Sequence, residues 1–152
     1  MRKANYDKFP STKLTGMLVQ GWDSIISMLK KKMDARKVLA VDLYTGVYEE
    51  EVLDAFSKEF SGRVMNVRDL MKPEKEIQAL TERFMTEDVL FGYVTNLRLE
   101  DYLDADKVAA ARKQISEAKE TIVIIGTGAA VVAPQDAMAV SYTHLTLPTN
   151  SL

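Results

Sequence analysis

A short apolar run near the C-terminal end constrains the fold more than any other feature of this sequence. Residues 121–125, Thr-Ile-Val-Ile-Ile, are all β-branched, and the glycines Gly126 and Gly128 follow at once. A strand that is apolar on both faces is typical of the interior of a parallel sheet, where helices cover each side. Closely spaced glycines mark the loop that ends such a strand. The run therefore predicts a central parallel strand in an α/β domain.

Helix and strand patterns alternate along the rest of the chain. The apolar spacing predicts a helix over 22–33, a strand over 38–44, a helix over 52–60, a strand over 64–67, a helix over 74–84, a helix over 108–119 and a strand over 136–140. Asp104 or Asp106 is expected to cap the helix over 108–119. Such alternation implies right-handed crossovers and a doubly wound, mostly parallel sheet, in a three-layer α/β/α domain.

Two segments are less regular. Residues 1–20 contain Pro10 and Gly16, which predict an N-terminal extension or hairpin with a strand at 17–19. Residues 86–103 fit a strand or a buried turn of helix equally well. The aromatic side chains in and beside this segment are predicted to pack in the core; they are Phe84, Phe91 and Tyr93.

Composition excludes several classes of function. Twenty Lys and Arg against 22 Asp and Glu leave a net charge of −2, which lacks the basic footprint of a nucleic-acid binder. The chain has no cysteine, so disulfides and thiolate metal sites are excluded and a reducing compartment is favoured. No apolar run has the length of a signal peptide or membrane span. We expect a cytoplasmic protein that binds neither nucleic acid nor membrane.

The loops at the carboxyl ends of the predicted parallel strands are where a ligand is expected, namely 44–48, 68–73 and 126–130. In the first of them Thr45 and Gly46 occupy the place of a phosphate-binding loop. A functional loop of this kind needs a second glycine, a lysine for the β- and γ-phosphates and a hydroxyl for magnesium. Residues 49–51 are instead three glutamates, which stabilise a helix N-terminus and would repel a triphosphate.

Two further loops carry candidate residues. Gly126 and Gly128 resemble the start of a dinucleotide fingerprint, but the third glycine is replaced by Val131. A strand-ending turn is the simpler interpretation, and a helix opening at 126–131 would favour the dinucleotide one. Asp69 follows the second strand and is a candidate general base toward a substrate hydroxyl, or a residue that bonds its own turn.

The order of these elements resembles the uridine-kinase-like branch of P-loop phosphotransferases. The likeness rests on VLAVDLY with the loop TGVYEEE, on RVMNV followed by Asp69, and on ETIVIIGTGAAVV. It implies a kinase-like fold in which Asp69 faces an acceptor hydroxyl and Thr45 and Gly46 lie at the nucleotide. Because the phosphate loop lacks its lysine, the expected module is degenerate and not catalytic.

A second likeness covers roughly residues 1–140, which we take as one domain. MRKANYDKFPS, KVLAVDLYTGVYEEEVLDAF, FGYVTNL and IVIIGTGAAVVAP resemble the N-terminal region of bacterial class I mannose-6-phosphate isomerase-like proteins. The resemblance implies a parent that interconverts mannose 6-phosphate and fructose 6-phosphate with zinc held by a C-terminal cupin. No metal site is expected in these 152 residues, and the partners implied are a sugar phosphate or nucleotide and the cupin itself.

The last twelve residues differ from the rest. Residues 141–152 contain no charged side chain, and VSYTHLTLPTN resembles the translated sequencing-adaptor read-through found in metagenomic reading frames. This predicts a truncated domain followed by a foreign tail, in which His144, the one histidine of the chain, has no function. Two alternatives stay open for the domain: an active small-molecule kinase with an atypical phosphate loop, and a non-enzymatic domain that docks on a cupin.

Overall fold

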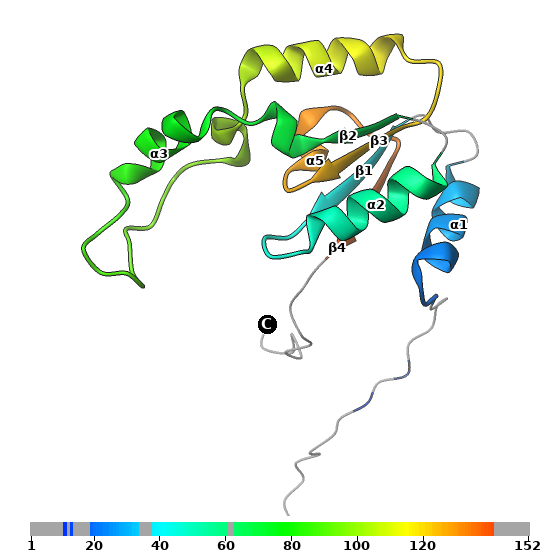
Figure 1. Cartoon of the computed structure of the whole chain (residues 1–152), viewed down its shortest axis with the longest axis horizontal. Coiled ribbons are helices and arrows are strands. Elements are labelled where there is room, and N and C mark those ends of the chain that lie inside the picture. The colour runs from blue at the N-terminus through cyan, green and yellow to red at the C-terminus, as the bar shows by residue number, and fades with distance from the viewer. Residues whose placement is uncertain (1–10, 12, 14–18, 34–37, 61–62, 142–152) are drawn as a thin grey trace, which may run out of the picture.

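The computed structural model describes residues 11, 13, 19–33, 38–60 and 63–141, which form a parallel sheet with helices on both faces (Figure 1). The elements are, in order, α1 (Trp22–Lys32), β1 (Val38–Leu43), α2 (Glu49–Glu59), β2 (Arg63–Asn66), the 3₁₀ turn η1 (Val67–Leu70), α3 (Glu74–Glu82), the 3₁₀ turn η2 (Leu99–Tyr102), α4 (Ala105–Glu117), β3 (Ile122–Gly126), α5 (Ala129–Val132) and β4 (Ala137–Ser141). The predicted strand at 17–19 and His144 lie outside the described residues.

The sheet has the strand order β2-β3-β1-β4, and all of its strand pairs are parallel. β3 is the apolar run that the sequence marks as central. It lies between two strands, with Ile124 opposite Ala40 on one side and Met65 on the other, and all five of its residues are buried. The predicted α/β fold class and the interior position of this strand are confirmed.

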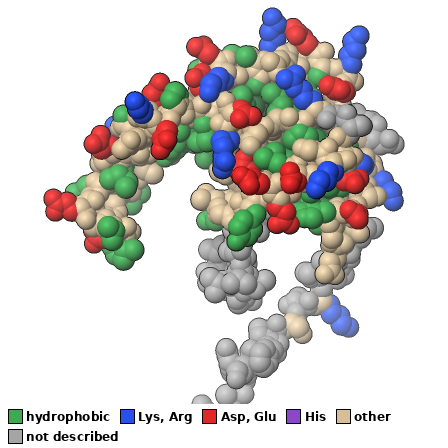
Figure 2. All heavy atoms as spheres, viewed as in Figure 1, with side chains coloured by type: hydrophobic (Ala, Val, Ile, Leu, Met, Phe, Trp, Pro, Cys, Tyr) green, Lys and Arg blue, Asp and Glu red, His purple; other side chains and the backbone are tan. Residues whose placement is uncertain are grey.

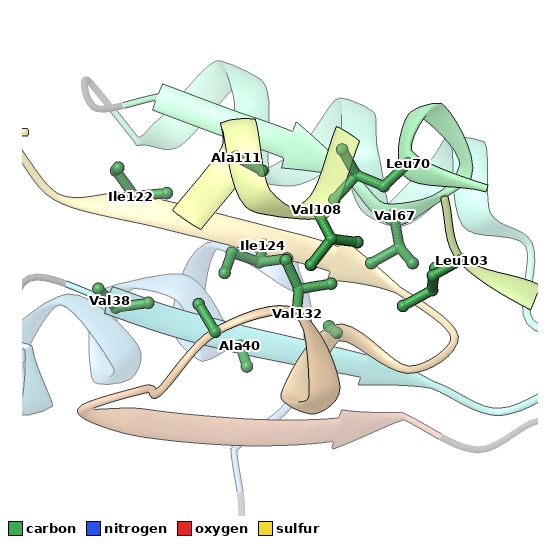
Figure 3. Close-up of a cluster of buried hydrophobic side chains, with 12 residues drawn as sticks. Val38, Ala40, Val67, Leu70, Leu103, Val108, Ala111, Ile122, Ile124 and Val132 are labelled. Carbon is green, nitrogen blue, oxygen red and sulfur yellow. The ribbon is translucent and has the colours of Figure 1, made fainter. Parts of the chain in front are cut away.

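Alternate residues of the inner strands face two separate apolar layers. On one face Ala40 and Ile124 pack under η1, α4 and α5, and Figure 3 shows Val108 and Val132 converging on them. On the other face Leu39 and Val123 pack under α1 and α2 with Phe56 at the centre. Each large side chain buried in this way stabilises the fold by about 1.5–3 kcal/mol. The two layers explain why β3 is apolar from Ile122 to Ile125 and why β1 is apolar except at Asp42.

Most predicted element ends agree with the structure within two or three residues. The carboxylate of Asp104 accepts hydrogen bonds from the backbone N–H groups of Asp106 and Lys107 at 3.0 and 3.1 Å, so Asp104 is the cap of α4. Val67 opens a 3₁₀ turn and does not continue β2. No helix in the described part of the chain is long and apolar enough to cross a bilayer.

The segment between η1 and α4 differs from the expectation. Residues 86–98 form neither a strand nor a helix, and no side chain of residues 72–102, which we call the arm, is buried. Phe91 and Tyr93 are about 70% exposed, while Phe84 is half-buried. The prediction that these aromatic residues pack in the core is therefore wrong for Phe91 and Tyr93. The sheet face nearest to the arm is already covered by η1 and α4.

Candidate functional site

The carboxyl ends of β1 and β3 are the point where the chain connections diverge. β1 leads into α2 on one face of the sheet, and β3 leads into α5 on the other. In open parallel sheets the crevice at such a point is the usual place for a ligand. Two adjoining cavities of about 410 and 440 Å³ open here. Both volumes lie in the range of about 300–1,000 Å³ that is typical of small-molecule sites.

Four residues line both cavities and form what we call the shared wall. They are Thr45, Glu49, Arg68 and Thr127. The first cavity continues along the loop over residues 43–50, and its lining mixes polar and apolar side chains. The second continues toward the stem of the arm, where its lining is more apolar and includes Met71, Leu99 and Tyr102. The shared wall thus joins a cavity of mixed polarity to a more apolar one.

An ion pair crosses the shared wall. Nη2 of Arg68 lies 3.3 Å from Oε2 of Glu49, and the two side chains are 68% and 21% exposed, respectively. The other carboxylate oxygen of Glu49, Oε1, is buried and has no hydrogen-bond partner within the described residues. A buried acceptor that is left unpaired destabilises a protein by about 1–3 kcal/mol. Rotation of the carboxylate that exposed this oxygen to the cavity, followed by a hydrogen bond from an O–H or N–H donor on a ligand, would remove that penalty.

The three glutamates at the start of α2 have different surroundings. Glu49 and Glu50 line the first cavity, whereas Glu51 accepts a hydrogen bond from Nε1 of Trp22 at 3.0 Å on the α1 side. The sequence suggests only a common role at the helix N-terminus. The structure adds a specific position for Glu49, opposite Arg68.

Thr45 and Gly46 lie at the first cavity, as the strand-end argument predicts. Their loop is a tight turn in which the N–H of Val47 donates to the carbonyl of Tyr44 at 3.1 Å. Gly46 has φ = +96°, a backbone conformation that favours glycine. The turn connects β1 to α2 directly, and its two predicted residues form one side of the cavity.

The loop that contains Gly128 is held by a residue that the sequence analysis did not identify. The carboxylate of Asp42 accepts hydrogen bonds from the N–H groups of Gly128 and Ala130 at 3.1 and 3.3 Å. A helix does open here, but it is the single turn α5. Two donors that a phosphate group would use are thus directed to Asp42, and Thr127 is the residue of this loop that lines both cavities.

Asp69 is exposed and lines neither of the two cavities. The neighbouring residue Arg68 lines both cavities instead. Asn66 fixes the start of this 3₁₀ turn, since its Oδ1 accepts a hydrogen bond from the N–H of Arg68 at 2.8 Å. The role of Asp69 as a general base stays a prediction. Within the described ranges, no group of three or more His, Cys, Asp or Glu side chains is placed to hold a metal ion.

Comparison with protein families gives one match. Residues 21–149 match the model of a domain of unknown function, DUF8485. The matched range includes residues 142–149, so the interpretation of the tail as foreign also stays a prediction. No curated protein and no solved structure matches the chain.

Proposed function

The chain belongs to the DUF8485 family of domains of unknown function, and we propose that it is a non-catalytic, kinase-like module that binds a sugar phosphate at the shared wall. One observation carries the proposal: Glu49, whose buried Oε1 has no hydrogen-bond partner among the described residues, is paired with the accessible guanidinium of Arg68 at the lining of a cavity at the carboxyl ends of β1 and β3. We further propose that the parent protein is a cytoplasmic mannose-6-phosphate isomerase whose zinc site lies in a cupin outside these residues.

The chemistry of the shared wall suits a polyol that carries one phosphate. The carboxylate of Glu49 lines both cavities and accepts hydrogen bonds, which sugar hydroxyls donate. The hydroxyls of Thr45 and Thr127 line the same cavities and can both donate and accept. The guanidinium of Arg68 is well suited to a phosphate monoester, because its N–H groups match the spacing of two phosphate oxygens.

The same residues disfavour phosphoryl transfer from a nucleoside triphosphate. The charged side chains that line the first cavity are Glu49, Glu50 and Arg68, so two negative charges face one positive charge. Transfer depends on cations that neutralise the charge of the transferred group. The loop after β1 lacks a lysine. After β3, the backbone N–H groups of Gly128 and Ala130 already donate to Asp42. Binding without transfer is the function that agrees best with these contacts.

We expect Arg68→Ala to weaken the binding of mannose 6-phosphate at least tenfold, because the variant removes the one cation among the described residues that line the two cavities. Calorimetric titration of the full chain measures this. Arg63→Ala is the matched control, since Arg63 is exposed at the start of β2 and lines neither cavity. Equal affinities in the two variants would exclude Arg68 as the phosphate contact.

One observation favours a second candidate function, a domain that docks on a cupin. Met138 and Val140 are about half exposed on the edge strand β4, on the face that also carries Ala40. A parallel strand normally has both faces covered. Association with a separately produced cupin domain, lost in Met138→Lys, would support this candidate; unchanged association in Met138→Lys would contradict it.

A further inference from the structure

The second cavity has an apolar part beyond the shared wall. The described residues that line this cavity but not the first are all apolar or aromatic; they are Val67, Met71, Leu99, Tyr102 and Leu103. Val67 and Leu103 are buried, whereas Leu99 is 46% exposed. Walls of this kind remove the apolar surface of a ligand from water. The second cavity therefore suits an apolar group, while the shared wall suits a sugar and a phosphate.

The stem of the arm holds these apolar walls in place. Met71 and Leu103 form an isolated antiparallel bridge where the arm leaves and re-enters the domain. Beside it, the N–H of Lys72 donates to the carbonyl of Tyr102 at 3.0 Å. The backbone contacts fix Met71 and Tyr102 without the help of a ligand, so this part of the cavity is formed in advance.

Leu99 connects the arm with the loop after β3, which supplies Thr127 to the cavity. It is the first residue of η2, and the N–H of Arg98 before it donates to Oδ2 of Asp101 at 2.7 Å. Cδ1 of Leu99 lies 3.5 Å from the position that a Cβ atom would take on Gly128. The side chain thus reaches from the arm to the strand-end loop, and it forms part of the apolar lining between them.

Arg68 lies at the junction of the two cavities, because it lines both of them. Its ion pair with Glu49 involves Nη2, and a guanidinium has five N–H donors. Bidentate binding of a phosphate uses two of its oxygens. A phosphodiester keeps two non-bridging oxygens for this contact and carries an ester group on each side. A phosphate held at the junction can therefore extend into both cavities at once.

We propose that the ligand is a phosphodiester in which one phosphate joins the sugar to an apolar alcohol. The proposal rests on the proposed function, from which it takes the sugar and the phosphate contact with Arg68. The sugar then lies on the side of the first cavity, and the apolar alcohol enters the second cavity against Leu99 and Tyr102.

The charge of the lining agrees with a diester. Glu49 and Glu50 face the single cation Arg68 among the described residues of the first cavity. A phosphate monoester carries a charge of about −1.5 to −2 at pH 7, whereas a diester carries one negative charge. Esterification of the phosphate therefore lowers the repulsion from the two glutamates and keeps the attraction of the guanidinium.

Calorimetric titration of the full chain with the methyl and the phenyl phosphodiester of mannose 6-phosphate tests this proposal. Both ligands have the same charge, so they differ in the apolar group alone. The phenyl diester is expected to bind about tenfold more tightly, since the second cavity buries part of its ring. Equal affinities of the two diesters would overturn the proposal, and binding of mannose 6-phosphate itself would then leave the proposed function standing. Absence of binding for all three ligands would overturn both.

Leu99→Asn tests the place of the apolar group. The variant should remove the advantage of the phenyl over the methyl diester and leave the affinity for the methyl diester unchanged, which also shows that it folds. Leu90→Asn is the matched control, because Leu90 is 81% exposed and lines neither cavity; Figure 2 shows exposed hydrophobic side chains at the far end of the arm. This control should keep the advantage. A phenyl advantage that survived Leu99→Asn would overturn the proposal.

Discussion

Replacing Gly126 with alanine should lower the free energy of unfolding by about 3 kcal/mol. A Cβ atom at this position would lie 2.8 Å from Cβ and 3.1 Å from Cγ2 of Val67. Val67 is the first residue of η1 and is itself buried in the layer that α4 covers (Figure 3), so it has little room to move. The backbone of Gly126 also has φ = +138°, which side chains rarely adopt. Denaturant unfolding followed by circular dichroism measures the loss.

Gly21→Ala separates the two causes of this effect. Gly21 also has a positive φ, +84°, but nothing lies within 4 Å of a Cβ built there. The control therefore carries backbone strain without a clash, and we expect it to destabilise the fold by about 1 kcal/mol. Equal losses of unfolding free energy in the two variants would show that the contact with Val67 does not contribute to the destabilisation by Gly126→Ala.

Replacing Asp42 with alanine should lower the free energy of unfolding by about 2 kcal/mol, because the N–H groups of Gly128 and Ala130 then lose their acceptor. Asp42→Asn keeps one acceptor oxygen and should lose about half as much. Thermal or denaturant unfolding of both variants measures the difference.

Asp54→Ala is the control for this pair of variants. Asp54 is an exposed aspartate of α2, and surface changes of this kind usually stay within about 0.5 kcal/mol of the wild type. If Asp42→Ala behaved like Asp54→Ala, the carboxylate would not hold the loop after β3. The simple strand-end turn proposed for Gly126 and Gly128 would then stand without it.

The strands could be predicted because burial on both faces leaves a local pattern. The run over 122–125 is apolar at every position, and this is a property of consecutive residues. The strand order could not be predicted in the same way. Nothing in the residues of β3 (Ile122–Gly126) says that it lies between β2 and β1, since the order depends on how the crossovers pass over the sheet.

The arm shows where the same reasoning fails. Phe91 and Tyr93 were predicted to be buried because aromatic side chains usually are, but residue type does not state which surface covers them. The domain closes its two apolar layers without them. An apolar side chain that the core does not use can be recognised only in the structure, where the residues that do form the core are known.

The site was predictable in place but not in detail. Loops 44–48 and 126–130 do meet at the cavities, because parallel strands end at one edge of the sheet. The pairing of Glu49 with Arg68 depends on η1 turning back toward α2, and the contact of Asp42 with Gly128 spans 86 residues. A lone acid in the apolar strand 38–43 was the one available sign of Asp42.

Calorimetric titration of the wild-type chain with mannose 6-phosphate tests the proposed function most directly, with mannose, inorganic phosphate and Mg-ATP as comparison ligands. The shared wall predicts that mannose 6-phosphate binds at least ten times more tightly than mannose or phosphate alone, and that Mg-ATP gives no measurable binding. Affinity for Mg-ATP that is abolished by Gly46→Val, without affinity for the sugar phosphate, would contradict the account and indicate an active kinase.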